Sequence, residues 1–117
     1  FSLKNSQICL SGFSQGCMMS INLGLISSEN YNCIVGFSGK VINQKDLVKR
    51  KTSSTKMLLI HGDKDEVVSP TFLLEAKDFL IRNNIEIETN MIKECEHHIP
   101  VEASSIALNY IKNNFKV

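Results

Sequence analysis

The residue whose type and surroundings most clearly predict chemistry is Ser14, in the pentapeptide Gly12-Phe13-Ser14-Gln15-Gly16. This is a G-x-S-x-G pattern, in which a serine occupies a strained turn between a strand and a helix, and the glycines leave space for that turn. A hydroxyl held in this way predicts nucleophilic attack on a carbonyl carbon. The backbone N–H of Gln15, at the start of the helix, is a candidate donor to the oxyanion that forms.

A serine hydroxyl is a weak nucleophile until a base takes its proton, and the base needs an acid that holds its tautomer. The chain offers both after Ser14, in the order serine, aspartate, histidine that accompanies this pattern. Asp63 and Asp65 lie in one loop after an apolar run, and His97 and His98 lie in a later loop. The residue types alone leave the acid open between the two aspartates and the base open between the two histidines.

These loops must be brought together by the strands that precede them. Continuous apolar runs at 7–10, 33–37 and 56–60 predict strands covered on both faces, which is typical of a parallel sheet. Residues 85–92 alternate with period two and predict a half-exposed last strand near a sheet edge. His61 follows the third run, and we expect it to end that strand without a chemical role.

Helices are predicted between these strands from the spacing of apolar residues. The helix over 15–26 has little polar circumference, so we expect it to be largely buried. The helix over 70–83 starts with Pro70 after the candidate cap Ser69, and a last amphipathic helix spans 100–115. The polar connection between the second and third strands has room for a short helix. This alternation predicts a doubly wound α/β sheet that binds ligands at the carboxyl ends of its strands.

The composition excludes several function classes. The chain has 117 residues, 43% of them hydrophobic and 21% charged, and a formal charge of +1, which argues against disorder and against binding to nucleic acid. No apolar stretch reaches the about 18 to 20 residues that span a bilayer, and no signal peptide is evident, so we expect no stable membrane insertion and a cytoplasmic location.

The cysteines and histidines do not predict a metal site. Cys9, Cys17 and Cys33 lie in apolar segments, where a free cysteine behaves as a small hydrophobic residue, and we expect them and Cys95 to be reduced. The sequence contains no Cys-x-x-Cys or His-Glu-x-x-His pattern of the kind that binds zinc. We therefore expect neither a metal nor a cofactor.

Taken together, these motifs resemble the phospholipase/carboxylesterase family, which includes acyl-protein thioesterases and bacterial carboxylesterases. The resemblance covers nearly the whole chain and rests on Gly12-Phe13-Ser14-Gln15-Gly16 with Cys17-Met18-Met19, on Val35-Gly36-Phe37-Ser38-Gly39, and on His61-Gly62-x-x-Asp65-x-Val67-Val68-x-Pro70. It implies that Asp65 is the acid and that His97, in Glu96-His97-His98-Ile99, is the base. Glu96 stands where the family has glycine, which keeps His98 as the alternative base.

The resemblance also implies a fold and its extent. We expect the C-terminal half of an α/β-hydrolase fold, a mostly parallel sheet flanked by helices, with residues 1–117 forming a partial domain. Family members have roughly 200 residues or more, and their first half supplies the opening strands and a His-Gly loop with a second oxyanion donor. Because the chain begins at Phe1, shortly before the nucleophile strand, we expect a fragment of a longer protein or the product of a split or decayed gene.

The implied activity is that of a serine hydrolase, and no cofactor is part of it. Such an enzyme cleaves a small carboxylic ester or thioester, with an acyl chain of short to medium length, through an acyl-enzyme on Ser14. The alternative is a truncated, inactive remnant or a half-domain that needs a partner. That partner would be a second copy of the chain or the missing N-terminal half.

Overall fold

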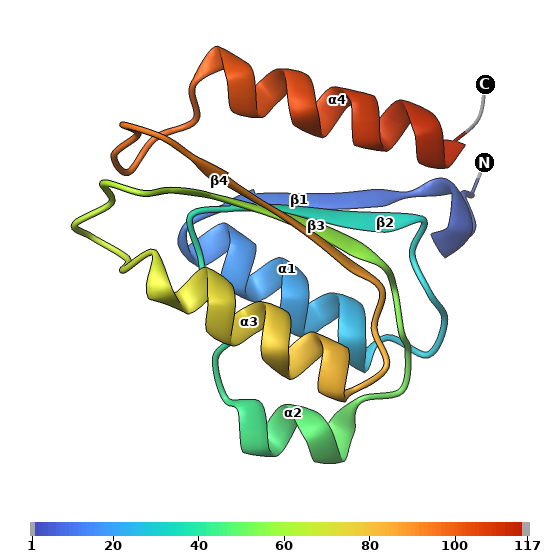
Figure 1. The fold of residues 1–117 in the computed structure, drawn as a ribbon. Coiled ribbons are helices and arrows are strands. Elements are labelled where there is room, and N and C mark those ends of the chain that lie inside the picture. Colours follow the sequence, from blue (N-terminus) through green and yellow to red (C-terminus); the bar gives the residue numbers. More distant parts are fainter. Residues whose placement is uncertain (1, 116–117) are drawn as a thin grey trace.

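The computed structural model describes residues 2–115, and residues 1, 116 and 117 of the predicted domain lie outside this range. The elements are η1 (Asn5–Gln7), β1 (Cys9–Phe13), α1 (Gln15–Ile26), β2 (Cys33–Phe37), α2 (Gln44–Arg50), β3 (Met57–Gly62), α3 (Thr71–Arg82), β4 (Ile87–Ile92) and α4 (Val101–Phe115). The strands form one sheet in the order β1-β2-β3-β4, and every neighbouring pair is parallel (Figure 1).

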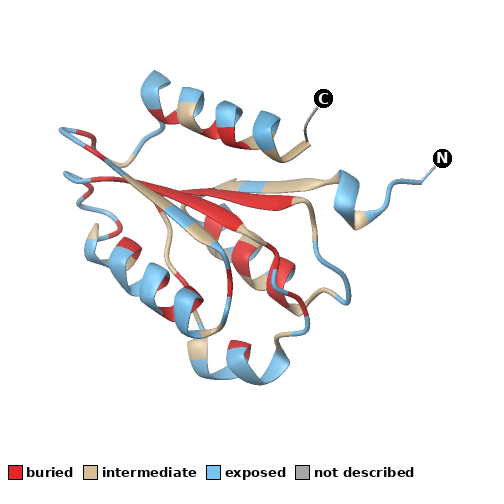
Figure 2. Ribbon diagram, turned by 45° about the vertical axis from the view of Figure 1, so that its right-hand side comes forward, coloured by how far each residue is buried: buried red, intermediate tan, exposed pale blue. Residues whose placement is uncertain are grey.

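Helices cover both faces of the sheet. Helices α1, α2 and α3 lie on one side and α4 on the other, so the central strands β2 and β3 are buried along their whole length (Figures 1 and 2). Successive strand residues point to opposite faces. Ile34 and Met57, which pair in register, pack with α1 and α3, whereas Val35 and Leu58 pack toward α4. Two apolar layers therefore fix the four strand ends that carry the candidate site.

The element order agrees with the sequence prediction, and several boundaries agree closely. The predicted ranges of α1 and β2 are those observed, and the short helix in the polar connection is α2. Pro70 immediately precedes α3 rather than opening it, and the Ser69 hydroxyl accepts a long hydrogen bond of 3.4 Å from the Thr71 amide. The half-exposed strand predicted over 85–92 is β4, at one edge of the sheet.

The prediction that α1 is largely buried is wrong. Cys17, Ile21 and Leu25 are buried against the sheet, but Met19 is 68% exposed and Leu23 is 50% exposed. These two side chains lie on the face of α1 that points away from the sheet, and no element among residues 2–115 covers them. An apolar sequence predicts what a helix tends to bury, but burial also requires a neighbour on each side.

The structure adds one observation on membranes. Among the helices within residues 2–115, none is both long enough and apolar enough to cross a bilayer.

Candidate active site

Ser14 occupies a strained turn between β1 and α1. Its backbone angles are φ 57° and ψ −116°, a region that costs a non-glycine residue on the order of 1 to 3 kcal/mol. The Ser14 N–H donates to the Phe37 carbonyl at 2.7 Å, which ties the turn to the end of β2. Of the two glycines expected to leave room for the turn, only Gly12 is required to lack a side chain. A Cβ on Gly12 would lie 2.2 Å from the Gly16 backbone, whereas a Cβ on Gly16 would meet nothing within 4 Å.

Asp65 lies in the loop that follows β3, and its carboxylate is held by the backbone of the same loop. The N–H groups of Val67 and Val68 each donate to Asp65 Oδ1 at 2.8 Å. Its side chain is fully buried. Burial alone would raise the pKa of Asp65, but the hydrogen bond from His97 and those from Val68 and Val67 outweigh it, so the pKa is lower than the ordinary value. Asp65 is therefore a carboxylate.

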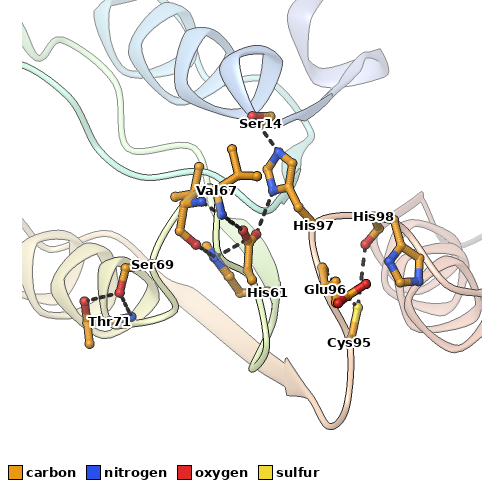
Figure 3. A network of polar contacts seen from close by, with 11 residues as sticks. Ser14, His61, Val67, Ser69, Thr71, Cys95, Glu96, His97 and His98 are labelled. Atoms are coloured by element: carbon orange, nitrogen blue, oxygen red, sulfur yellow. Dashed lines mark hydrogen bonds and ion pairs between the residues drawn. The ribbon is translucent and has the colours of Figure 1, made fainter.

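His97 lies in the loop between β4 and α4 and joins the other two residues (Figure 3). Its Nδ1 lies 2.7 Å from Asp65 Oδ2, and its Nε2 lies 3.1 Å from Ser14 Oγ. Because a carboxylate only accepts, the proton of the neutral ring is on Nδ1, which leaves Nε2 free to accept from the serine hydroxyl. The structure thus brings Ser14, Asp65 and His97 together from three separate loops.

The alternative acid and base lie outside this chain of contacts. The Asp63 carboxylate accepts from the Glu94 N–H at 2.8 Å and is exposed. His98 is also exposed, and its contacts run through its backbone, with its N–H donating to the Glu96 carbonyl at 3.0 Å. Asp65 and His97 are therefore the pair whose side chains meet near Ser14.

The loops that carry Asp65 and His97 interlock through their backbones. The Lys64 N–H donates to the Cys95 carbonyl at 2.9 Å, and the Asp63–Glu94 hydrogen bond lies beside it. A Cβ on Gly62 would lie 2.2 Å from the same Cys95 carbonyl oxygen. Glycine at this position permits a close approach that any other residue would block. The separation between the candidate acid and base is thus fixed by direct contact of their loops.

Gln15, the candidate oxyanion residue, is the first residue of α1. Its N–H is one of the amides that a helix leaves without an acceptor inside the helix. It follows Ser14 directly and lies at the end of the helix that carries positive partial charge. A hydrogen-bond donor is therefore available next to the Ser14 hydroxyl.

His61 contacts the Asp65 loop, which the sequence did not predict. Rather than only ending its strand, it lies within β3, is 1% exposed, and places Nε2 3.4 Å from Asp65 Oδ2. The same nitrogen lies 2.8 Å from the Val68 carbonyl oxygen. The signal in the sequence is the four-residue spacing of His61 and Asp65, which by itself does not predict a contact across a loop.

The surroundings of His97 are partly apolar. The rings of Phe13 and His97 are 4.7 Å apart between centroids and tilted by 45°. An open hollow of about 360 Å³ adjoins them and is lined by Phe13, His97, His98 and Ile99. Cys95 is buried nearby, and burial, together with the carboxylates of Asp65 and Asp63, raises the pKa of its thiol. Cys95 is therefore a neutral thiol and not a competing nucleophile.

Metal-ligating side chains do not cluster in this region. Within residues 2–115, no group of three or more His, Cys, Asp or Glu side chains is arranged to hold a metal ion.

Comparison with known sequences identifies relatives of this chain. The sequence profile of the phospholipase/carboxylesterase family matches residues 2–115. Acyl-protein thioesterase 1 of Yarrowia lipolytica is 31% identical over 117 residues, covering 95% of this chain and 51% of the relative. Esterase YpfH of Escherichia coli is 23% identical over 103 residues, covering 88% of this chain and 43% of the relative. The chain therefore spans about half the length of the curated relatives it matches.

Solved structures agree with the predicted fold. Esterase PE8 matches with a TM-score of 0.92 and 31% identity, covering 95% of this chain and 52% of that structure. SOBER1 of Arabidopsis thaliana matches with a TM-score of 0.91 and 19% identity, covering 97% and 55%, a likeness of fold alone. The predicted fold class, the C-terminal half of an α/β-hydrolase fold with a parallel sheet flanked by helices, is confirmed. With its profile match, its relatives and its fold in agreement, the chain belongs to the phospholipase/carboxylesterase family.

Proposed function

We propose that this chain carries the catalytic residues of a serine hydrolase that cleaves carboxylic esters or thioesters. The observation that carries the proposal is the continuous line of contacts from Ser14 Oγ through the His97 ring to Asp65 Oδ2, at 3.1 and 2.7 Å. The relatives, an acyl-protein thioesterase and two esterases, support the same reaction class. The apolar hollow beside His97 gives an acyl or alcohol group a surface to lie on.

The proposed reaction has two halves. Ser14 Oγ attacks the carbonyl carbon while its proton moves to His97 Nε2, and the Gln15 N–H donates to the oxyanion. The tetrahedral intermediate collapses as Nε2 returns the proton to the leaving alcohol or thiol, leaving an acyl ester on Ser14. Water then attacks this ester with His97 again as the base, and the carboxylic acid leaves. Asp65 remains a carboxylate throughout and holds the imidazole in one orientation.

A second candidate is a half-domain that becomes active only with a partner or is an inactive remnant. Two observations favour it. The chain spans about half the length of its curated relatives, and Met19 and Leu23 of α1, beside the candidate nucleophile turn, are exposed. In this case the three residues keep their contacts, but the chain by itself does not turn over substrate.

Labelling with a fluorophosphonate probe distinguishes the two candidates. The purified chain, Ser14→Ala and the matched control Ser11→Ala, which removes an exposed serine of β1, are compared by intact mass together with turnover of p-nitrophenyl butyrate. Stoichiometric labelling of the parent and of Ser11→Ala, but not of Ser14→Ala, with turnover, is the result expected for autonomous catalysis. A folded parent that does not react contradicts it and favours the half-domain.

A further inference from the structure

A second imidazole, that of His61, reaches the carboxylate that His97 contacts (Figure 3). We propose that His61 is a positioning residue that acts through the Val68 carbonyl to orient the Asp65 carboxylate toward His97. The inference rests on the proposed function, because it concerns the acid of the proposed triad. It assigns a role to a histidine that makes no contact with Ser14.

The protonation of His61 follows from its hydrogen-bond partner. His61 is 1% exposed, and its Nε2 lies 2.8 Å from the Val68 carbonyl oxygen. A carbonyl oxygen only accepts, so Nε2 carries a proton and donates it there. The same nitrogen lies 3.4 Å from Asp65 Oδ2. His61 therefore donates to the last residue of the turn formed by residues 65–68 and lies beside the carboxylate of the first.

The Val68 peptide transmits this contact to the acid. Its carbonyl accepts from His61, while its own N–H and that of Val67 donate to Asp65 Oδ1 at 2.8 Å. Oδ1 is thereby occupied by the backbone, and Oδ2 is the oxygen left for His97 at 2.7 Å. The carboxylate of an aspartate can rotate about the Cβ–Cγ bond unless both oxygens are held. His61 thus fixes the peptide that fixes Oδ1, and so sets the direction in which Oδ2 faces.

A phenylalanine at position 61 would fill similar space but could not donate. The buried Val68 carbonyl would lose its partner, and the turn would be free to rearrange around it. A glutamine could still offer an N–H at nearly the position of Nε2. The pair His61→Phe and His61→Gln therefore separates packing from hydrogen bonding. Asn113→Gln is the control, because that residue is an exposed amide of α4, outside the loops that carry the site.

The first readout is the low-field proton resonance of His97 Nδ1–H, which a short hydrogen bond to a carboxylate shifts downfield. We expect His61→Phe to displace or broaden this resonance, and His61→Gln and Asn113→Gln to leave it near its parental position. A folded His61→Phe protein with the parental resonance overturns the proposal, and so does a His61→Gln protein as altered as His61→Phe. This readout needs no turnover, so it remains decisive even if Ser14 proves unreactive.

The second readout is the rate of fluorophosphonate labelling of Ser14, with turnover where the parent has it. Misplacement of a catalytic group lowers rates on the order of tenfold to a hundredfold, and we expect a loss of this size in His61→Phe with KM unchanged and the rate largely restored in His61→Gln. If His61→Phe does not fold, the ¹⁵N chemical shifts of His61 in the parent protein test the proposal, because they show which ring nitrogen carries the proton. A proton on Nε2 supports the proposal, and a proton on Nδ1 overturns it.

Discussion

The two outer strands of the sheet differ in how well they suit an exposed position. Strand β4, IETNMI, carries Glu88 and other polar side chains, which is how natural edge strands discourage further pairing. Strand β1, CLSGF, carries no charge, and its neighbour α1 has none over Gln15–Ile26, whereas α3 of equal length has four charged residues, Glu75, Lys77, Asp78 and Arg82. The sheet therefore has one edge adapted to water and one that is not.

This contrast divides the candidate site. Asp65 and His97 belong to the loops after β3 and β4, on the side of the charged edge strand. Ser14 belongs to the turn after β1, between the uncharged edge strand and the uncharged helix α1. The geometry of the acid and base is determined by the direct contact between their two loops. The nucleophile is held mainly by its own turn and by the hydrogen bond to Phe37.

The largest expected effect tests the turn itself. Gly12→Ala places a Cβ 2.2 Å from the Gly16 backbone, so the turn must open, at a cost of about 3 kcal/mol in the free energy of unfolding. Gly16→Ala is the matched control, since its Cβ meets nothing within 4 Å. We expect it to be neutral or slightly stabilising, because alanine favours a helix. Urea denaturation of both variants measures the difference, and equal losses would contradict this account of the turn.

Asp65→Asn tests the loop after β3 through the pH dependence of stability. Because the pKa of Asp65 is below its usual 3.8, the unfolded chain binds this proton more readily than the folded protein does. The carboxylate's contribution to stability is therefore complete above 3.8 and lost as the pH falls through the folded value, at about 1.4 kcal/mol for each unit of difference. We expect a shallower acid dependence of the unfolding free energy in Asp65→Asn than in the parent, measured by urea denaturation at a series of pH values. An equally steep dependence in the two proteins would contradict this account.

The strain at Ser14 predicts a smaller effect. Glycine adopts positive φ without the penalty that alanine has, so Ser14→Gly should be more stable than Ser14→Ala by about 1 kcal/mol. Both variants remove the hydroxyl, and both should be inert to the fluorophosphonate probe. Thermal unfolding of the two proteins measures the difference. Greater stability of the alanine variant would show that the turn relaxes when the hydroxyl is absent.

The smallest effect on stability is expected from charges on the exposed face of α1. Met19→Lys with Leu23→Lys should change the free energy of unfolding by about 0.5 kcal/mol or less per site, as surface substitutions do. Self-association should respond more strongly, because these side chains lie beside the uncharged edge. Sedimentation velocity should show less concentration-dependent association than in the parent. The control, Leu74→Lys with Ile81→Lys on α3, should associate like the parent. Equal effects of the two pairs would contradict the proposed difference between the uncharged β1 side and the charged β4 side.

Local patterns predicted most of the fold, because the signals that set it are local. The apolar run at 33–37 and the helical spacing at 15–26 gave the observed boundaries of β2 and α1. Exposure of Met19 was not predictable in the same way, since it depends on what packs against α1 and not on α1 itself. Sequence periodicity describes an element's preference, and a neighbour decides whether the preference is met.

The candidate site was predictable in its parts but not in its connections. Ser14 was indicated by its pentapeptide, and Asp65 and His97 by resemblance, while their catalytic roles stay predictions. The contact of His61 with the Val68 carbonyl could not be foreseen, because it joins a side chain to a backbone group across a loop. Likewise, only the three-dimensional structure shows that a Cβ has free space at Gly16 and none at Gly12.

The interlocked loops have a consequence for motion. Since Gly62 and Lys64 meet the Cys95 carbonyl directly, the segments bearing Asp65 and His97 should move as one rigid body. Any hinge motion at this edge of the molecule would then leave the 2.7 Å His97–Asp65 contact intact and act at the 3.1 Å contact between His97 and Ser14. Any loss of the assembled site would therefore begin between the turn that carries Ser14 and the paired loops that carry Asp65 and His97.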